Sequence, residues 1–519
     1  MMKKTIFLTV WNVTTKPSAM NRSVFKQANT FVKNGYNPVI LTFDFIFDYP
    51  QIERELHAVG LLDDRVRILN VYDYYREAFN EQSMSAEQKA YYENSIQKFE
   101  EGYWVEDDGA TARYFVNGVY TKYKRWDKNG QLMIVDEFDD NRVRMSRREF
   151  HPEGFLARET LYHPANNKRN QERYFTRSGF CYLTVWYNNE TDRQQSVFLF
   201  DPAFSKAEVF GALRPFHTYW IDQLTKIEAV KPIVIAQKPS AVDRLQLVEN
   251  DNVSRIFMRH TSHLAVEQPE NGDVNFAKDV ASLLEVIPKG YPIVVTTELQ
   301  KRHLEKHVGD RGNIFVMPDY FESCATDVSR KTKHFVSISS YDSMHATGQL
   351  LDAFKIVLET VPDATLSLYG KLLKPRKEAI MKKMKRLEIT KSVSLNQYTL
   401  NIDPILAEAT AQIVMSKTEG QGASIGEAFA NGTPVIAYDV PFGAQEMING
   451  QNGVLVEFEN VDALAQAMID LATNEDKVRQ MSVAAKAYAD EYLSKQRYTD
   501  NWLSLLDHID QYDPKEPLI

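Results

Sequence analysis

The sequence contains few cysteines and no concentrated basic block, and both shortages narrow the range of functions. Only two cysteines, Cys181 and Cys324, occur in 519 residues. They give neither a disulfide framework nor the spacing of a metal site, so we expect a reducing, cytoplasmic environment. The formal net charge is −9. An acidic chain without a basic stripe lacks the electrostatic footprint of a nucleic-acid-binding protein, so we expect no nucleic acid among its partners.

Long hydrophobic runs are also missing. The first residues, "MMKKTIFLTVWNVTT", place a basic pair before an apolar stretch that soon becomes polar. This stretch is too short for a signal peptide or a membrane-spanning helix. We therefore interpret it as a first β-strand.

The order of apolar segments predicts an α/β protein. "KTIFLTV" and "NPVILTFDF" are typical of buried strands, and between them apolar residues recur at helical spacing up to Gly35. A strand, helix and strand in this order favour a parallel sheet covered by helices. The length of the chain implies two to four folded units.

An internal repeat interrupts this pattern between residues 76 and 205. In three segments an aromatic residue lies four positions before a glycine and another lies eight after it, with turn signals about every 12 residues. We expect an antiparallel meander whose aromatics share one face. Such a face more often packs on a partner than stays bare, although a purely structural insert is the alternative. The repeat consists of Trp126, Gly130 and Phe138; Phe150, Gly154 and Tyr162; and Phe175, Gly179 and Tyr187.

The α/β pattern resumes near residue 206, so the expected domains are discontinuous. A second series of strands includes "HFVSIS", "ATLSLYG", "AQIVMS" and "TPVIAYD", and a final apolar helical pattern contains Trp502, Leu505, Leu506 and Ile509. We expect four parts: a Rossmann-like domain of residues 1–75 and 206–325, the β-meander of 76–205 inserted in it, a second Rossmann-like domain of 326–490, and a C-terminal helix within 491–519 that packs back.

One short stretch of the second domain combines two glutamates with glycines. "EGQGASIGEAFANG" begins at Glu419 and places Glu427 eight positions later, where a predicted loop leads into a predicted helix. Free N–H groups at a helix start, approached closely through Gly420 and Gly422, suit a phosphate. A carboxylate one turn into the helix can accept hydrogen bonds from ribose hydroxyls. A single glutamate at such a place more often only complements the helix dipole.

This stretch resembles the E-x7-E signature of retaining glycosyltransferases of family four, which have the GT-B fold of two Rossmann-like domains and use nucleotide-sugar donors. The β-rich insert and "DVPFGAQEMI" are similar, more particularly, to the bacterial group that glycosylates wall teichoic acid or serine-rich adhesins. The resemblance covers nearly the whole chain. It implies a hexosyltransferase that takes glucose or N-acetylglucosamine from a UDP-sugar, with no metal or other cofactor.

The resemblance also assigns residues. It implies that Glu419 and a histidine orient the donor sugar as the catalytic pair, and that Glu427 holds the ribose. "FMRHTSHL" supplies His260 for this role, with His263 as the alternative, although a lone histidine is more often structural. The other donor-binding residues that we expect from this stretch and from the strand "ATLSLYG" are Gly420, Gly422, Ser424 and Lys371.

The sequence departs from the family pattern where a departing diphosphate needs positive charge. Ser340 and His345 stand at the positions of the expected arginine and lysine. Lys371 and Lys16, each in a loop after a predicted strand, are candidate replacements, although single loop lysines are more often only solvated. Two functions therefore stay open, an active transferase and a non-catalytic relative that binds acceptor or stabilises an active paralogue.

The expected partners follow from these alternatives. They are a nucleotide sugar, a polymeric or protein acceptor, and either a second copy of the chain or a paralogous transferase bound through the β-meander. The expected location is the cytoplasm, with peripheral attachment at the inner face of the membrane as a variant.

Overall fold

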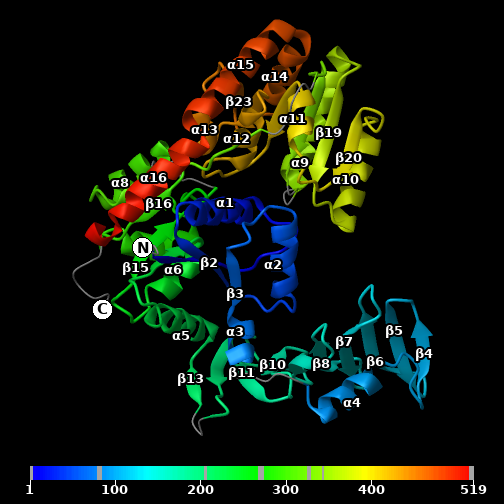
Figure 1. Cartoon of the computed structure of the whole chain (residues 1–519). Coiled ribbons are helices and arrows are strands. Elements are labelled where there is room, and N and C mark those ends of the chain that lie inside the picture. The colour runs from blue at the N-terminus through cyan, green and yellow to red at the C-terminus, as the bar shows by residue number, and fades with distance from the viewer. Residues whose placement is uncertain are drawn as a thin grey trace. The chain divides into compact units, whose positions relative to one another are not determined.

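The computed structural model describes residues 4–78, 84–203, 207–266, 274–323, 329–339, 341 and 344–512. The chain divides into two compact units (Figure 1). The first unit contains residues 1–236 and 240–253, and the second contains residues 237–239 and 254–516. The domain boundaries expected from the sequence stay a prediction.

A parallel sheet contains the strands predicted at the start of the chain. The strand order is β17-β16-β15-β14-β1-β2-β3. Every residue of β1 (Thr5–Val10) is buried, and β1 pairs in parallel with both β2 and β14. The other elements of this part are β2 (Asn37–Thr42), β3 (Arg67–Asn70), β14 (Ile233–Ala236), α1 (Ala19–Lys33), α2 (Tyr49–Ala58), α3 (Val71–Ala78), α5 (Leu213–Lys226) and α6 (Pro239–Leu245).

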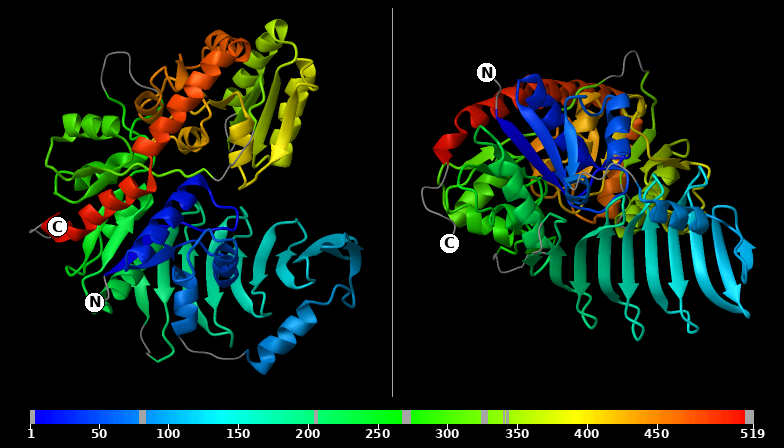
Figure 2. Two further views of the ribbon diagram at one scale, coloured as in Figure 1. Left: turned by 45° about the horizontal axis from the view of Figure 1, so that its top comes forward. Right: turned by 60° about the horizontal axis from the view of Figure 1, so that its bottom comes forward.

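Ten strands that follow β3 in sequence form a separate antiparallel sheet, which Figure 2 shows as a long row. Each strand pairs with its neighbours in sequence, so the predicted meander is confirmed. The strands are β4 (Trp104–Asp107), β5 (Thr111–Val116), β6 (Val119–Trp126), β7 (Leu132–Phe138), β8 (Arg144–Phe150), β9 (Leu156–Tyr162), β10 (Arg169–Phe175), β11 (Cys181–Tyr187), β12 (Gln194–Leu199) and β13 (Glu208–Phe210).

The repeated glycines occupy turns, but the repeated aromatics do not share one face. Gly130, Gly154 and Gly179 have φ of 79°, 90° and 92°, as tight turns require. The strand register shifts at or beside the terminal aromatics of several strands, and such bulges disturb the alternation of faces. Successive aromatics also end strands of opposite direction. The prediction of a single aromatic face is therefore wrong.

The aromatics instead form two groups. Trp126 and Phe150 are buried in a cluster with Tyr91 and Tyr92 of α4 (Ala86–Ser95). Phe138 and Tyr162 end their strands at the other edge and flank the guanidinium of Arg144, 5.8 and 5.3 Å from the ring centres.

Three residues spaced four apart, two in helix α4 and one just after it, contact two glycine turns of the meander and Trp126. Because these residues recur about once per helical turn, they lie along one side of the helix. Gln88 contacts the turn of Gly179, where a Cβ added to the glycine would lie 2.6 Å from Nε2 of Gln88. Tyr92 contacts the turn of Gly154, where an added Cβ would lie 3.0 Å from the tyrosine ring. The indole N–H of Trp126 donates to the Ile96 carbonyl at 3.1 Å.

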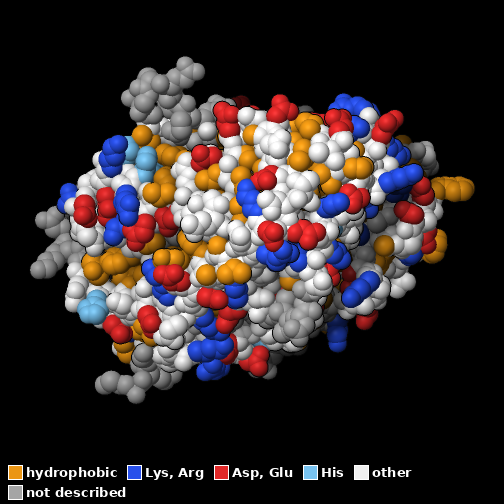
Figure 3. All heavy atoms as spheres, turned by 90° about the horizontal axis from the view of Figure 1, so that it is seen from above, with side chains coloured by type: hydrophobic (Ala, Val, Ile, Leu, Met, Phe, Trp, Pro, Cys, Tyr) orange, Lys and Arg blue, Asp and Glu red, His pale blue; other side chains and the backbone are white. Residues whose placement is uncertain are grey.

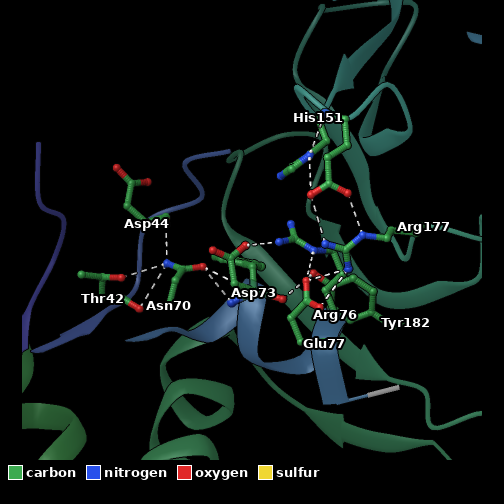
Figure 4. Close-up of polar contacts among 11 residues, drawn as sticks. Thr42, Asp44, Asn70, Asp73, Arg76, Glu77, His151, Arg177 and Tyr182 are labelled. Atoms are coloured by element: carbon green, nitrogen blue, oxygen red, sulfur yellow. Dashed lines mark hydrogen bonds and ion pairs between the residues drawn. The ribbon is translucent and has the colours of Figure 1, made fainter. Parts of the chain in front are cut away.

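Ion pairs connect α3 to the ten-stranded sheet (Figure 4). The Arg76 side chain is 5% exposed and lies 3.0 Å from an Asp73 carboxylate oxygen and 3.3 Å from Glu77. Arg177 joins Glu77 at 2.8 Å to Glu153 at 2.7 Å. Burial raises the pKa of Asp73 to about 6, and the charge of Arg76 opposes that rise. Asp73 is therefore a buried acid whose ionisation depends on Arg76.

Asn70 fixes the strand ends from which α3 begins (Figure 4). Its Nδ2 donates to Thr42 Oγ1 at 3.1 Å and to the carbonyl of Asp44 at 2.9 Å, and its Oδ1 accepts from the N–H of Tyr72 at 3.0 Å. Tyr182 of the meander donates its hydroxyl to the Tyr72 carbonyl at 3.0 Å. Within the first unit, the meander is thus hydrogen-bonded to the start of α3, which follows β3.

The second unit contains strands β15 to β17 and a second parallel sheet in the order β20-β19-β18-β21-β22-β23. Two parallel sheets with helices between their strands confirm the α/β class and are consistent with GT-B. The strands are β15 (Ser254–Met258), β16 (Ile293–Val295), β17 (Ile314–Val316), β18 (His334–Ile338), β19 (Thr365–Gly370), β20 (Val393–Gln397), β21 (Ala411–Val414), β22 (Val435–Tyr438) and β23 (Gly453–Val456).

The predicted final helix is present and packs through the predicted residues. Trp502, Leu505, Leu506 and Ile509 are buried, and the first three of them lie in α16. The helices of this unit are α7 (Ala281–Val286), α8 (Glu298–Val308), α9 (Met344–Thr360), α10 (Lys374–Arg386), α11 (Asp403–Glu408), α12 (Ala423–Ala430), α13 (Gly443–Met447), α14 (Val461–Thr473), α15 (Glu475–Tyr492) and α16 (Lys495–Asp507).

The described residues form no membrane-spanning helix, and the face shown in Figure 3 carries charges of both signs. Among the described residues, no helix is both long and apolar enough to cross a bilayer. Acidic and basic side chains are interspersed over the face shown in Figure 3. This face therefore offers no broad basic surface of the kind that tracks a nucleic-acid backbone.

Candidate functional site

The two glutamates flank the start of a helix, as the sequence predicts. The loop after β21 leads through Glu419 into α12. Gly422 is the N-cap and has φ 88°, a conformation that residues with side chains rarely adopt. The helix begins at Ala423, and Glu427 follows about one turn later.

Backbone contact brings this loop against the segment that follows β15. A Cβ built on Gly420 would overlap the carbonyl oxygen of His260, and it would lie 3.2 Å from the Cα of Thr261. The neighbour is main chain, which cannot rotate away as a flexible side chain can. Only glycine fits at this position without moving the backbone. The structure thus places Glu419 and Gly420 beside His260, two segments about 160 residues apart in the sequence.

The surroundings of His260 favour its neutral imidazole form. Its Nε2 lies 2.8 Å from Oε1 of Gln237 and donates to that oxygen, so Nδ1 carries no proton when the ring is neutral. Burial lowers the pKa of His260, and the nearby charges of Lys238 and Arg259 lower it further, while Asp319 acts in the opposite direction. A neutral ring in this place can accept a hydrogen bond from a sugar hydroxyl through Nδ1.

Glu419 lies in a partly closed environment. Burial raises the pKa of Glu419, and a hydrogen bond with Ser416 opposes that rise. The main chain of the loop is held from its other side, because a Cβ on Gly443 would overlap the carbonyl of Gln421 and because the Phe442 N–H donates to the Glu419 carbonyl at 3.3 Å. The loop therefore has a fixed shape in which its carboxylate is partly withdrawn from water.

The other residues of α12 are placed by the buried side of the helix. A Cβ on Gly426 would overlap the ring of Phe321, so this side packs closely. Ser424 and Glu427 are only partly buried. The Glu427 carbonyl accepts from Asn431 Nδ2 at 2.9 Å. The role of Glu427 at a ribose stays a prediction.

The two lysines predicted as replacement cations, Lys371 and Lys16, are both exposed. Lys371 follows β19 directly and is exposed. The end of β19 lies against the residues after β18, since a Cβ on Gly370 would overlap the carbonyl of Ser339. Ser340 lies outside the described residues. Lys16 is exposed in the loop between β1 and α1 of the first unit.

His345 lies close to two residues, Glu459 and Lys417, that the sequence did not indicate as site residues. Its Nε2, in the first turn of α9, lies 3.3 Å from Oε1 of Glu459. Lys417 Nζ lies 3.1 Å from the same oxygen. Lys417 stands two positions before Glu419 in the same loop. That closeness to the E-x7-E stretch is the signal by which the sequence could have indicated it.

His263 belongs to a packed group of rings. Its Nε2 lies 2.8 Å from Nδ1 of His303 in α8, and its ring stacks on Phe442 with centres 4.8 Å apart. Burial lowers the pKa of His263 to about 3, and the charges of His303, Arg259 and His307 act in the same direction. These contacts fit a structural role in holding the segment after β15.

The stretch "DVPFGAQEMI" also serves to hold the site. The carboxylate of Glu446 accepts hydrogen bonds from the N–H groups of Glu298 and Leu299, at 3.1 and 2.8 Å, at the start of α8. Negative charge at a helix N-terminus is favourable. Glu446 thus ties α13 to the helix that carries His303.

The described residues contain no group of three or more histidine, cysteine, aspartate or glutamate side chains arranged to hold a metal ion. The expectation that the reaction needs no metal stays a prediction.

Comparison with known proteins gives the class of the second domain. Residues 325–488 match the family model "Glycosyl transferases group 1". The chain therefore carries a glycosyltransferase domain, and the candidate residues of the E-x7-E stretch lie within it.

Two curated relatives and one solved structure resemble almost the whole chain. The poly(ribitol-phosphate) alpha-N-acetylglucosaminyltransferase of Staphylococcus aureus is 24% identical over 97% of this chain and 99% of its own length. The poly(glycerol-phosphate) alpha-glucosyltransferase of Bacillus subtilis is 24% identical over 91% of this chain and 70% of its own. A crystal structure of a mutant of TarM from S. aureus, in complex with fondaparinux, alpha-GlcNAc-glycerol and UDP, covers 97% of this chain and 100% of its own, with a TM-score of 0.84 at 21% identity.

Proposed function

We propose that this chain, through its glycosyltransferase domain, is a retaining hexosyltransferase that moves glucose or N-acetylglucosamine from a UDP-sugar to a cell-wall polymer. The family match of residues 325–488 supports the reaction class. The names of the two relatives, one a glucosyltransferase and one an N-acetylglucosaminyltransferase acting on polyol-phosphate polymers, support the donor and the teichoic acid acceptor. A Ser/Thr-rich surface protein is the second acceptor that the sequence resemblance favours.

The observation that carries this proposal is the backbone contact between Gly420 and His260. It brings a carboxylate with a raised pKa, Glu419, beside a neutral histidine at the carboxyl ends of strands, where open α/β sheets bind their ligands. A carboxylate and an imidazole can together orient the hydroxyls of a hexose.

In the proposed reaction, UDP lies against the second parallel sheet. Glu427 accepts hydrogen bonds from the ribose hydroxyls, and the start of α12, opened by Gly420 and Gly422, receives phosphate. Glu419 and His260 orient the hexose. The acceptor hydroxyl attacks the anomeric carbon from the face that the nucleotide leaves, which gives retention. Helix N-termini and side-chain cations hold the diphosphate, so no metal is required.

Replacing Glu427 with alanine tests the donor site. Losing charge-assisted hydrogen bonds to a ribose is expected to weaken UDP binding about 10-fold to 100-fold. Calorimetric titration of UDP, UDP-glucose and UDP-N-acetylglucosamine measures this, with Glu359→Ala as the control because Glu359 is an exposed glutamate of α9 in the same domain. Equal affinities in the wild type and Glu427→Ala would contradict the assigned role.

A non-catalytic relative that binds acceptor or stabilises an active paralogue is the second candidate. The observation that favours it is the absence of arginine and lysine at the positions of Ser340 and His345. The titration separates the two candidates, because failure of the wild type to bind any of the three nucleotides would favour the second.

The ten-stranded sheet has a separate place in the proposal, as an insert in the first Rossmann-like domain that binds acceptor or another chain. Its outer strand β4 bears Trp104, 77% exposed, close in sequence to Phe99, 71% exposed. An unpaired edge with apolar side chains is a template for association. We expect a cytoplasmic homo-oligomer or a complex with a paralogous transferase, attached at the inner face of the membrane.

The edge can be tested by changing Trp104 to lysine. A charge at the edge is expected to reduce the mass of the assembly, measured by light scattering, to that of one chain. Val483→Lys is the control, because Val483 is 72% exposed on α15. A single-chain mass for the wild type, or an unchanged multimer for Trp104→Lys, would exclude self-association through β4.

A further inference from the structure

Lys417, Glu459 and His345 form a charge cluster next to the candidate donor site. One carboxylate oxygen, Oε1 of Glu459, lies 3.1 Å from Lys417 Nζ and 3.3 Å from His345 Nε2. The ring of Phe458 lies 5.6 Å from the same lysine nitrogen. The Lys417 side chain is 35% exposed, so it is held rather than free in solvent.

The three residues come from three different strand ends of one sheet. Lys417 follows β21, Glu459 follows β23, and His345 lies in the helix after β18. The sheet order places β21 between β18 and β22, with β23 at the edge. All these strands are parallel, so their carboxyl ends meet at one edge of the sheet. This is the edge at which open α/β sheets bind ligands.

Lys417 is also tied in sequence to the residues that would contact the donor. It lies two positions before Glu419 and five before Gly422, the N-cap of α12. The fixed shape of this loop therefore positions the lysine together with the catalytic candidate. Lys371 and Lys16, by contrast, are exposed.

A lysine at this place could stabilise the diphosphate that leaves in the proposed reaction. When the bond between the anomeric carbon and the β-phosphate oxygen breaks, its electron pair stays on that oxygen. The new bond forms to the acceptor oxygen, whose proton passes to the departing diphosphate. Positive charge aimed at the departing group stabilises this transition state, and lysine binds phosphate as a point charge.

We propose that Lys417 is the phosphate-binding cation of this site and that Glu459 is a positioning residue, which holds Lys417 and His345 at the carboxyl ends of the strands until the donor arrives. This inference rests on the proposed function. The donor diphosphate takes the place of the Glu459 carboxylate as the partner of Lys417 Nζ. The cation is thus supplied from the loop of β21 and not from the two positions where the family pattern places it.

Comparing ligands with and without phosphate tests this inference. Uridine, UMP and UDP are titrated into the wild-type chain and into Lys417→Met. UDP affinity is expected to fall about 10-fold to 100-fold, because charge-assisted hydrogen bonds are lost, while uridine affinity stays the same. Lys417→Arg, which keeps the charge, is expected to restore most of the UDP affinity. Glu459→Gln is expected to change the ratio of UDP to uridine affinity, which loss of a merely structural contact would leave unchanged.

Lys333 provides a matched control. Its side chain is also 35% exposed and pairs with Asp363 at 2.8 Å, but it precedes β18 and so lies at the amino end of the strands. Lys333→Met should leave all three affinities unchanged.

Each other outcome has a definite meaning. An unchanged UDP-to-uridine ratio in Lys417→Met would overturn the role of Lys417 and leave the donor site intact. Loss of uridine and UDP together would assign Lys417 to the conformation of the loop and would likewise overturn it. A wild-type chain that binds neither uridine nor UDP would refute the donor site itself, and with it the proposed function.

Discussion

Gly420→Ala is expected to lower the rate of sugar transfer by about 100-fold or more, since a displacement of about 1 Å in a catalytic constellation has an effect of that size. The added methyl group would overlap the carbonyl oxygen of His260. Because that neighbour is backbone, either the loop of Glu419 or the segment after β15 must move. The two candidate catalytic side chains would then separate.

Loss of activity in Gly420→Ala through displaced site residues can be distinguished from loss through unfolding of the chain. Transfer is measured with UDP-sugar and an acceptor polymer, and thermal unfolding of the same samples reports the fold. Gly211→Ala is the control, because Gly211 has no heavy atom within 4 Å of an added Cβ. Activity of Gly420→Ala within a few-fold of the wild type would show that this contact does not set the geometry of the site.

Arg76→Met is expected to have the largest effect on stability. Arg76 is 5% exposed and faces the carboxylates of Asp73 and Glu77. Removing one partner of a buried ion pair leaves an uncompensated charge and costs about 3–5 kcal/mol. Urea unfolding followed by tyrosine and tryptophan fluorescence measures the loss. Arg65→Met, which breaks an exposed pair with Asp63, should change stability little.

The effect of Arg76→Met should depend on pH in a direction set by Asp73. The folded-state pKa of Asp73 is raised to about 6 by burial, above its ordinary value of 3.8. Its charged form therefore destabilises the folded state, and this penalty is present at pH 7 and disappears as pH falls through 6 toward 4. Without Arg76 the penalty grows, so the difference from the wild type should be largest at neutral pH. A difference that does not change between pH 7 and pH 4 would assign the loss to packing.

Much of the fold was predictable because its signals are local. Runs such as "KTIFLTV" and "TPVIAYD" are short, apolar and bounded by turn residues. In the meander, Gly130, Gly154 and Gly179 mark the turns. Strands β3 and β23 were missed, because "RILN" and "GVLV" are four residues long and show no periodicity. The prediction of a single aromatic face was wrong because the spacing of aromatic residues does not show where strand ends bulge.

The candidate site was predictable only where one segment carries it. Glu419, Gly422 and Glu427 are close in sequence and were placed together correctly around the start of α12. The contact between Gly420 and His260 depends on how two distant segments meet. The sharing of Glu459 by Lys417 and His345 depends on the order of strands in the sheet, which the sequence does not state.

The spacing of the contact residues along helix α4 matches the spacing of the hairpins that it contacts. Gln88 and Tyr92 contact the turns of Gly179 and Gly154, and the carbonyl of Ile96, just after the helix, accepts a hydrogen bond from Trp126. Duplicating a hairpin under α4 would add two strands, or about 10 Å of sheet width, with no helix residue in step with the new turn. We therefore expect such a sheet to change length in evolution by whole hairpins, added where α4 does not contact the sheet.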